Sequence, residues 1–356
     1  MLTFVLLSVL VIILWVRVNS MPNGIRRDKR ENYYTTLIIA IIIILAAFRS
    51  EETGADTPGY MREYGEIARL TWQQITERFN GYSTYYYLSK VFRELHMPLF
   101  VWFAFVEFVY LYAIKLFIGK YSTDKILSLI LFISMGLFTF SLAGLKQVMA
   151  MALMLYAFYL FSEKKYIITI ILIVLAYLSH NTSLIFLFVF PLYYLRDKKI
   201  FWPVVITAII VLAFYGGLFL LGAADMYERE TGNEHFSTYL DFENNHSPVM
   251  LIYYISLIIF CIPGLLAYKR KDSGQMRLAL GVCMIASASQ ILAFYSPHAF
   301  RFAYYFLPFY MVLVPNSHSS MTGPIKKVMG FVIVVSVIFY FLYVNRAFVY
   351  SMDFII

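Results

Sequence analysis

Three basic side chains stand at unexpected places in a very apolar sequence. Arg49, Lys146 and Arg301 lie at the ends of apolar stretches, and His180 lies in a short polar turn between two others. Charged groups close to the hydrocarbon core of a membrane are costly, so they usually mark a binding or catalytic site. Guanidinium and ammonium groups bind phosphate oxygens, and a neutral imidazole accepts a proton near pH 7. These four residues therefore predict a site for an anionic, lipid-linked substrate.

The composition indicates that these charges belong to a membrane protein. The chain has 356 residues, of which 61% are hydrophobic and 14% charged, and its mean hydropathy is +0.71. A soluble domain does not carry that much apolar surface, so the sequence predicts an all-α polytopic membrane protein. The net charge of +8 comes from basic residues dispersed at the ends of apolar stretches, which argues against a nucleic-acid partner. Cys261 and Cys283 fall inside apolar stretches, where thiols behave as small buried hydrophobes.

Apolar runs bounded by charged clusters predict about twelve transmembrane spans in a single integral membrane domain, residues 1–356. The spans are 2–18, 34–48, 98–118, 126–142, 146–162, 166–179, 181–195, 201–222, 249–268, 277–295, 302–315 and 328–348. With residue 1 outside, 19 of the 29 Lys and Arg residues fall on inner segments. Of the ten outside, six lie at or in one long loop, where the positive-inside bias is weak. The distribution of Lys and Arg therefore indicates that residue 1 lies outside the cytoplasm.

Two outer loops are long enough to have structure of their own. The first extracytoplasmic loop, residues 49–97, is expected to be partly helical, because Thr57-Pro58 is typical of a helix start. Thr71 followed by Gln74 predicts a capping box, and an Asn-Gly turn then precedes a tyrosine-rich amphipathic segment. The second extracytoplasmic loop, residues 223–248, is polar and acidic.

Short spans predict that the candidate residues are recessed. Spans 166–179 and 181–195 correspond to roughly 21–23 Å of helix, against a hydrocarbon core of about 30 Å. The turn between them holds His180, so this turn should lie below the outer surface, inside protein or beside a water-filled cavity. The same argument applies to the turns before Lys146 and Arg301, and to the end of the second span at Arg49. Four turns at one depth predict an outward-facing cavity.

Each candidate residue also has a purely structural interpretation. Arg49, Lys146 and Arg301 could be anchors that extend to the membrane interface, and His180 could cap a helix. Asp56 could orient the helix that starts after it, or it could contact substrate. The sequence shows no Cys/His metal spacing and no nucleotide-binding motif, so we expect no metal and no cofactor.

Several short motifs follow one another in the order of a known family. They are Phe48-Arg49, Gly54-Ala55-Asp56-Thr57 with Tyr60, Gly144-Leu145-Lys146-Gln147 with Ala150, Ala176 through His180 with Ser183, and Arg301 with Tyr305-Phe306. In this order and spacing, the chain resembles the EpsG/Wzy-type family of bacterial exopolysaccharide polymerases. One position departs from the family pattern, which usually has Arg where this chain has Lys146. Lysine keeps the positive charge but not the bidentate fork.

The resemblance implies a GT-C-like glycosyltransferase. Such an enzyme joins oligosaccharide repeat units, carried on undecaprenyl pyrophosphate, into an exopolysaccharide, capsule or O-antigen-like chain. Its site would face the outside of the bacterial cytoplasmic membrane, and its partners would be membrane lipid, a flippase and a chain-length regulator (co-polymerase). The residues it implies for binding pyrophosphate and glycan are Arg49, Lys146, Gln147, Arg301, Tyr60 and Tyr305.

The residue types also suggest a mechanism. Cations in a water-poor recess stabilise a pyrophosphate leaving group, because Coulomb attraction grows as the dielectric falls. His180 is the first candidate for the base that takes the acceptor hydroxyl proton, since the ordinary pKa of histidine is about 6.5. Asp56 is the second candidate.

Two other functions are open at this point. One is another GT-C glycosyltransferase or ligase with a lipid-linked sugar donor, in which Asp56 would be the base. The other is a transporter or flippase for lipid-linked glycan. Transporters often show internal repeats and charges near the midplane, whereas this sequence shows no repeat and its charges lie at the outer ends.

Overall fold

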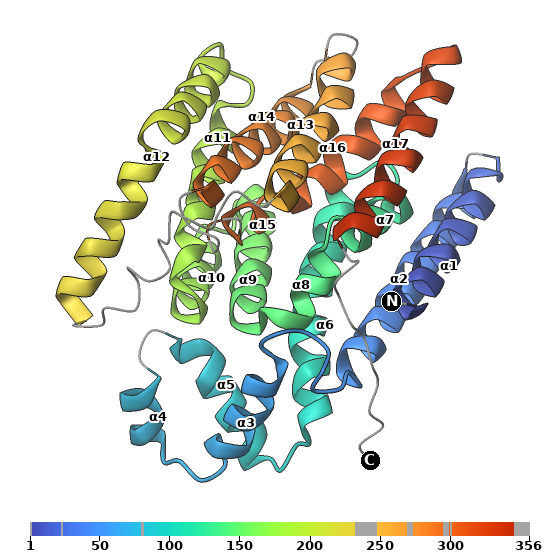
Figure 1. The fold of residues 1–356 in the computed structure, drawn as a ribbon. Coiled ribbons are helices and arrows are strands. Elements are labelled where there is room, and N and C mark those ends of the chain that lie inside the picture. Colours follow the sequence, from blue (N-terminus) through green and yellow to red (C-terminus); the bar gives the residue numbers. More distant parts are fainter. Residues whose placement is uncertain are drawn as a thin grey trace. The chain divides into compact units, whose positions relative to one another are not determined.

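The computed structural model describes residues 2–22, 24–79, 82–231, 248–268, 273–294, 299 and 301–344, and every regular element in these ranges is a helix (Figure 1). The chain divides into two compact units, Met1–Leu184 with Val337–Ile356, and Ile185–Ser336. The divisions fall within η1 (Asn181–Phe188) and within α17 (Gly323–Val344). The expectation of a single domain over residues 1–356 stays a prediction.

In the described residues of the first unit, ten helices precede the first division. They are α1 (Leu2–Asn19), α2 (Ile25–Ala47), α3 (Thr57–Ile67), α4 (Trp72–Arg78), α5 (Ser83–Glu94), α6 (Leu99–Tyr121), α7 (Lys125–Ser134), α8 (Leu137–Ala143), α9 (Leu145–Ser162) and α10 (Tyr166–Ser179). Helix α9 packs against α6 and α10, and α2 packs against α6 and α7. The three helices of the first long loop, α3 to α5, gather at one end of the unit (Figure 1).

At the end of the unit away from α3 to α5, polar contacts join the ends of neighbouring helices. The Trp15 indole donates to the Asp124 carboxylate at 2.7 Å, which joins the end of α1 to the start of α7. The Lys125 amide donates to the Glu31 carboxylate at 2.6 Å, and Lys120 at the end of α6 forms an ion pair with Glu163 at the end of α9. All of these residues except Trp15, which lies in the predicted span 2–18, are on segments that the charge distribution assigns to the inside. These contacts place the segments at one end of the unit, and their orientation in the membrane stays a prediction.

The span expected at residues 126–142 is wrong as a single helix. Helices α7 and α8 are bent by 55° relative to each other, and Gly136 between them has φ +79°. Glycine adopts this left-handed conformation readily because it has no Cβ, so it ends α7 where hydropathy alone indicates a continuous span. The side chains of both helices are almost entirely buried, so this broken segment belongs to the core.

Helix α2 is longer than the span predicted at 34–48. It begins at Ile25 and has 23 residues, which corresponds to about 34 Å of helix. Its first turns carry charged side chains, whose ends reach water. The helix can therefore continue beyond the apolar region. The argument that Arg49 is recessed because it follows a short span is therefore wrong.

The first long loop is helical, as the sequence predicts. Thr71 and Gln74 form the expected capping box: the Gln74 amide donates to the Thr71 hydroxyl at 3.2 Å, and the Thr71 amide donates to the Gln74 side chain at 2.8 Å. The N-cap of α3 is Asp56 rather than Thr57, so that helix starts one residue earlier than predicted. The expected Asn-Gly turn lies outside the described residues.

The second unit is also helical in its described part. After η1 it contains α11 (Val189–Leu195), α12 (Phe201–Thr231), α13 (Pro248–Tyr268), α14 (Gly274–Ser289), η3 (Gln290–Phe294), α15 (Arg301–Tyr304), α16 (Leu307–Ser320) and the start of α17. Helix α14 packs against α12, α13 and α16. The free thiols of Cys261 and Cys283 are buried here, as predicted. The loop expected at 223–248 starts too early, because α12 continues to Thr231, and residues 232–247 lie outside the described part.

Within the described residues, five helices are long and apolar enough to cross a membrane, or six if the bent pair α7–α8 counts as one span. The five are Ile25–Ala47, Leu99–Tyr121, Leu145–Ser162, Phe201–Leu218 and Gly274–Leu292. Shorter apolar helices are Thr3–Asn19, Tyr166–Ser179, Asn181–Leu195 and Tyr254–Tyr268. The chain is thus an all-helical polytopic membrane protein, while the number of twelve spans and the GT-C-like arrangement stay predictions.

Candidate functional site

A tight turn before α3 packs against the junction of α8 and α9. Gly54 has φ +88°, and a Cβ added to it would lie 3.0 Å from the Leu142 carbonyl oxygen and 3.3 Å from the Ala143 Cα. The Thr57 hydroxyl lies 3.2 Å from the same Leu142 oxygen, to which it donates. Only glycine combines this conformation with such a close approach. The contact places the turn directly beside the start of α9, where Lys146 lies.

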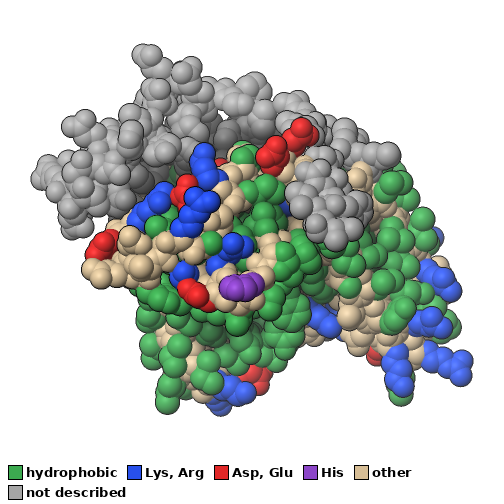
Figure 2. Space-filling model, turned by 90° about the horizontal axis from the view of Figure 1, so that it is seen from below, with side chains coloured by type: hydrophobic (Ala, Val, Ile, Leu, Met, Phe, Trp, Pro, Cys, Tyr) green, Lys and Arg blue, Asp and Glu red, His purple; other side chains and the backbone are tan. Residues whose placement is uncertain are grey.

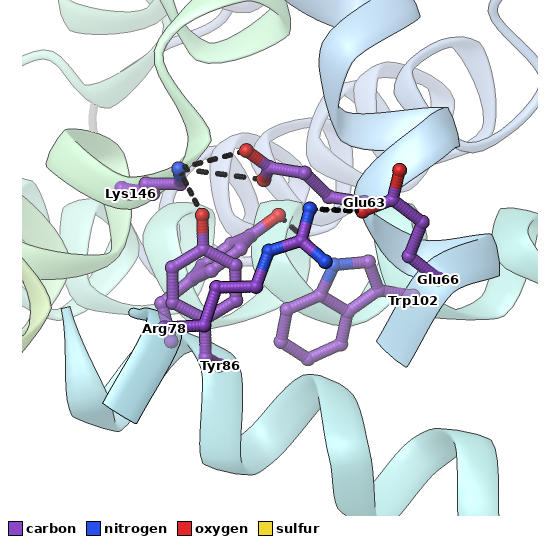
Figure 3. A network of polar contacts seen from close by, with 7 residues as sticks. Glu63, Glu66, Arg78, Tyr86, Trp102 and Lys146 are labelled. Carbon is purple, nitrogen blue, oxygen red and sulfur yellow. Dashed lines mark hydrogen bonds and ion pairs between the residues drawn. The ribbon is translucent and has the colours of Figure 1, made fainter. Parts of the chain in front are cut away.

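The ammonium of Lys146 lies among four tyrosine rings, and Figure 3 shows it beside one of them, Tyr86. Its distances to the ring centroids are 4.6 Å for Tyr86, 5.2 Å for Tyr82, 5.5 Å for Tyr60 and 6.0 Å for Tyr85. It also donates a hydrogen bond to the Tyr86 hydroxyl. Aromatic faces attract cations through their quadrupoles, so the rings stabilise the charge of a side chain that is only 18% exposed. We call these four residues the tyrosine cage.

Glu63 completes this network and is absent from the sequence prediction. Its two carboxylate oxygens lie 3.3 Å and 3.4 Å from the Lys146 ammonium nitrogen (Figure 3). On α3, Glu63 follows the buried Tyr60 by three residues and precedes the buried Ile67 by four, so it shares their face of the helix. A carboxylate on the apolar face of an amphipathic helix is the signal that could have identified it.

The buried tyrosines of α5 stay neutral. Burial raises the pKa of Tyr86 far above its usual range, and the negative charge of Glu63 raises it further. Burial likewise raises the pKa of Tyr85, whose hydroxyl accepts a hydrogen bond from the Trp102 indole at 3.2 Å. Neither phenol therefore serves as a base near pH 7.

Asp56 is half-buried and acts electrostatically on Lys146. It occupies the N-cap position of α3, yet its side chain makes no cap hydrogen bond. Within the described part of the chain its carboxylate forms no hydrogen bond or ion pair. The structure thus shows no contact that supports the helix-orienting interpretation of Asp56, and its contact with a substrate stays a prediction.

His180 lies next to Tyr82 of the tyrosine cage. It follows the last residue of α10, and its ring centroid is 5.7 Å from that of Tyr82, whose face Lys146 also approaches. The Nδ1 atom of His180 and the Thr182 hydroxyl form a hydrogen bond of 2.6 Å. If Nδ1 carries the proton and donates, Nε2 keeps its lone pair and can accept a proton. Thr182 therefore orients the imidazole.

Arg49 is almost completely buried. Its side chain is 2% exposed, and its guanidinium carbon lies 3.7 Å from the centroid of the Phe103 ring. It donates a hydrogen bond of 3.0 Å to the Ala46 carbonyl at the end of α2, which satisfies a helix C-terminus. Arg49 also interacts electrostatically with Glu107, which is fully buried in α6. In this structure Arg49 supports α2 and the protein core, and its contact with a ligand stays a prediction.

The remaining predicted residues are divided between the units. Gln147 is buried on α9, next to Lys146. Arg301 starts α15 in the second unit and is half-buried, and Tyr305, just after that helix, is buried. The structure brings Lys146, Tyr60 and His180 together, whereas a shared site with Arg301 and Tyr305 stays a prediction.

The surface at this end is of mixed charge. Viewed from the side on which α3 to α5 lie, basic and acidic side chains gather beside one another and hydrophobic side chains flank them (Figure 2). In the part of the chain that the structure describes, no group of three or more His, Cys, Asp or Glu side chains could hold a metal ion.

Fold and site together define a polytopic, all-helical membrane protein with a polar site among tyrosines at one end of its helices. Comparison with protein families then identifies its group. The sequence model of the EpsG family matches residues 32–355, nearly the whole length, so the chain belongs to the EpsG family. No curated protein and no solved structure matches the chain. Membership confirms the resemblance and indicates a polymerase-type function in exopolysaccharide synthesis.

Proposed function

We propose that the chain is a glycosyltransferase that polymerises oligosaccharide repeat units linked to undecaprenyl pyrophosphate, at the outer face of the bacterial cytoplasmic membrane. The observation that carries this proposal is the convergence of Lys146, Asp56 and His180, which come from three separate segments, around the tyrosine cage. All three lie within residues 32–355, the part of the chain that the EpsG family model matches, and in the short motifs on which the resemblance to that family rests.

The leaving group determines what Lys146 would do. When the acceptor hydroxyl oxygen bonds to the anomeric carbon, the bond from that carbon to the pyrophosphate oxygen breaks, and the electron pair leaves with the pyrophosphate. The developing charge is stabilised by a cation that is already in place and shielded from water. Lys146 meets both conditions, because the tyrosine cage holds its ammonium and leaves it 18% exposed.

The acceptor hydroxyl must also lose its proton. We assign this role to the Nε2 atom of His180, with the Nδ1 proton donated to the Thr182 hydroxyl. The carboxylate of Asp56 is the second candidate, since it lies at the same end of the unit and interacts with Lys146. The proposal includes a GT-C-like arrangement and cooperation with a flippase and a chain-length regulator.

Reconstitution in liposomes tests the function directly. The purified protein is given undecaprenyl-pyrophosphate-linked repeat unit, and lipid-linked products are separated by gel electrophoresis. We expect a ladder of lengthened glycan that disappears in Lys146→Met and persists in Lys115→Met, because Lys115 lies on α6 and contacts Thr36 instead. Movement of the repeat unit across the bilayer without lengthening would contradict the proposal and favour a flippase.

A further inference from the structure

The ion pair between Glu63 and Lys146 is loose. Both of its N–O distances, 3.3 Å and 3.4 Å, exceed the range of about 2.7–2.9 Å that is usual for a charge-assisted hydrogen bond. Another pair that uses α3, between Glu66 and Arg78, is 2.6 Å long (Figure 3). Glu63 therefore neutralises Lys146 without a tight hydrogen bond.

Lys146 has other contacts that fix its position. The four rings of the tyrosine cage surround its ammonium, and the Tyr86 hydroxyl accepts its hydrogen bond. The Tyr86 hydroxyl also interacts with the Glu63 carboxylate, but the faces of the four rings carry no net charge and do not need that carboxylate to hold the ammonium. Glu63 itself is 28% exposed and has a flexible side chain, so its carboxylate can turn to water at modest cost.

We propose that Glu63 is a displaceable counter-ion, which pairs with Lys146 in the empty site and gives way to the pyrophosphate of the substrate. This inference rests on the proposed function. Pyrophosphate carries more negative charge than one carboxylate, so Coulomb attraction favours the exchange. The return of Glu63 competes with the leaving pyrophosphate after transfer. Glu63 thus weakens substrate binding and assists product release.

Substitution of Glu63 by glutamine measures the competition. Glu63→Gln keeps the size of the side chain and removes its charge, so inorganic pyrophosphate should bind the purified protein about tenfold more tightly, which corresponds to about 1.4 kcal/mol. Isothermal titration calorimetry at fixed ionic strength gives the dissociation constant. Glu66→Gln is the matched control, because it removes the same charge from the same helix without contacting Lys146. Its affinity should stay within about twofold of the unmodified protein.

Further variants separate this inference from general effects of charge or folding. Glu63→Asp withdraws the carboxylate by one methylene and should also tighten binding, by a smaller factor. In Glu63→Gln combined with Lys146→Gln, the gain should vanish. Unchanged or weaker binding in both Glu63 variants overturns the inference, even if polymerisation depends on Lys146. If Lys146→Gln alone binds pyrophosphate normally, the inference fails together with the proposed role of Lys146.

The anion that displaces Glu63 has two conceivable sources. A uronic acid in the repeat unit offers a carboxylate, and the lipid carrier offers the pyrophosphate. Titration with glucuronate beside pyrophosphate distinguishes them. A larger gain for pyrophosphate than for glucuronate in Glu63→Gln supports the proposal, and an equal or larger gain for glucuronate overturns the assignment to pyrophosphate.

Discussion

The charge of Lys146 is stabilised by aromatic rings and by one loosely paired carboxylate. This environment explains how a lysine can hold its charge at this position. A compact ammonium fits between the four rings, whereas an arginine would stack against one ring and use its fork of donors. The position therefore depends more on the charge than on the shape of the group that carries it.

Substitutions of Lys146 test this dependence on charge. Lys146→Arg should keep polymerisation within about threefold, because a guanidinium also interacts with aromatic faces and with the Glu63 carboxylate. Lys146→Met should lose at least about tenfold, since a lost transition-state contact of about 1.4 kcal/mol costs that factor. Initial rates of chain lengthening in liposomes measure both. Equal losses in the two variants would mean that the ammonium itself is required.

The hydrogen bond between His180 and Thr182 yields a second test at this scale. His180→Gln should abolish lengthening yet still bind lipid-linked repeat unit, because an amide forms hydrogen bonds but does not accept the proton. Thr182→Val should lower the maximal rate several-fold with little change in KM, since it removes only the contact that orients the ring. Retained polymerisation in His180→Gln would transfer the role of base to Asp56.

At the scale of elements, the turn before α3 determines whether the site forms. Asp56 comes within reach of Lys146 because Gly54 approaches the backbone of residues 142 and 143 so closely. The glycine, rather than the polar residues around it, makes this geometry accessible. The motif that runs from Gly54 to Thr57 is thus a docking element as well as a source of one carboxylate.

Gly54→Ala should destabilise the protein by roughly 1–3 kcal/mol, because alanine disfavours a positive φ and its Cβ would crowd the Leu142 oxygen. Gly59→Ala is the matched control: it lies inside α3, where an added Cβ meets nothing within 4 Å. Alanine favours a helix interior, so this change should be neutral or slightly stabilising. Thermal denaturation in detergent compares the two. Equal melting temperatures would show that the turn does not need glycine.

The sequence predicts the elements of the first unit better than their contacts. Hydropathy and capping signals identify α9, α10 and α4, since these depend on local side chains. The break at Gly136 escapes a hydropathy window, because the average over a span does not register one left-handed residue.

At the site, too, the sequence reveals the residues of local motifs but not those that come together only by tertiary packing. Motif order identifies Lys146, Asp56 and His180, which carry recognisable chemistry. It does not reveal Glu63 or the full tyrosine cage, because their contact with Lys146 exists only after α3 and α5 have packed beside α9. The burial of Arg49 against Phe103 is likewise a tertiary feature.

At the scale of the whole molecule, the two ends of the first unit differ in chemistry. One end carries the contact of Trp15 with Asp124 and that of Lys120 with Glu163, and the last three of these residues lie on segments that the charge distribution assigns to the cytoplasm. The other end carries α3 to α5 with the tyrosine cage. A polymerase that acts on a lipid-linked donor at the outer face requires the second end to be outside.

Cysteine labelling in intact cells tests this orientation. In a background with Cys261 and Cys283 replaced, Glu66→Cys on α3 should react with a membrane-impermeant maleimide, because this position lies at the end that carries the tyrosine cage. Arg30→Cys and Lys198→Cys should react only after the cells are permeabilised, since both lie on segments assigned to the inside by the positive-inside rule. All three positions lie in the described residues and are not fully buried, so exposure to reagent depends on the side of the membrane. The reverse pattern would place Lys146 and His180 at the cytoplasmic face, where an outward-facing polymerase is impossible.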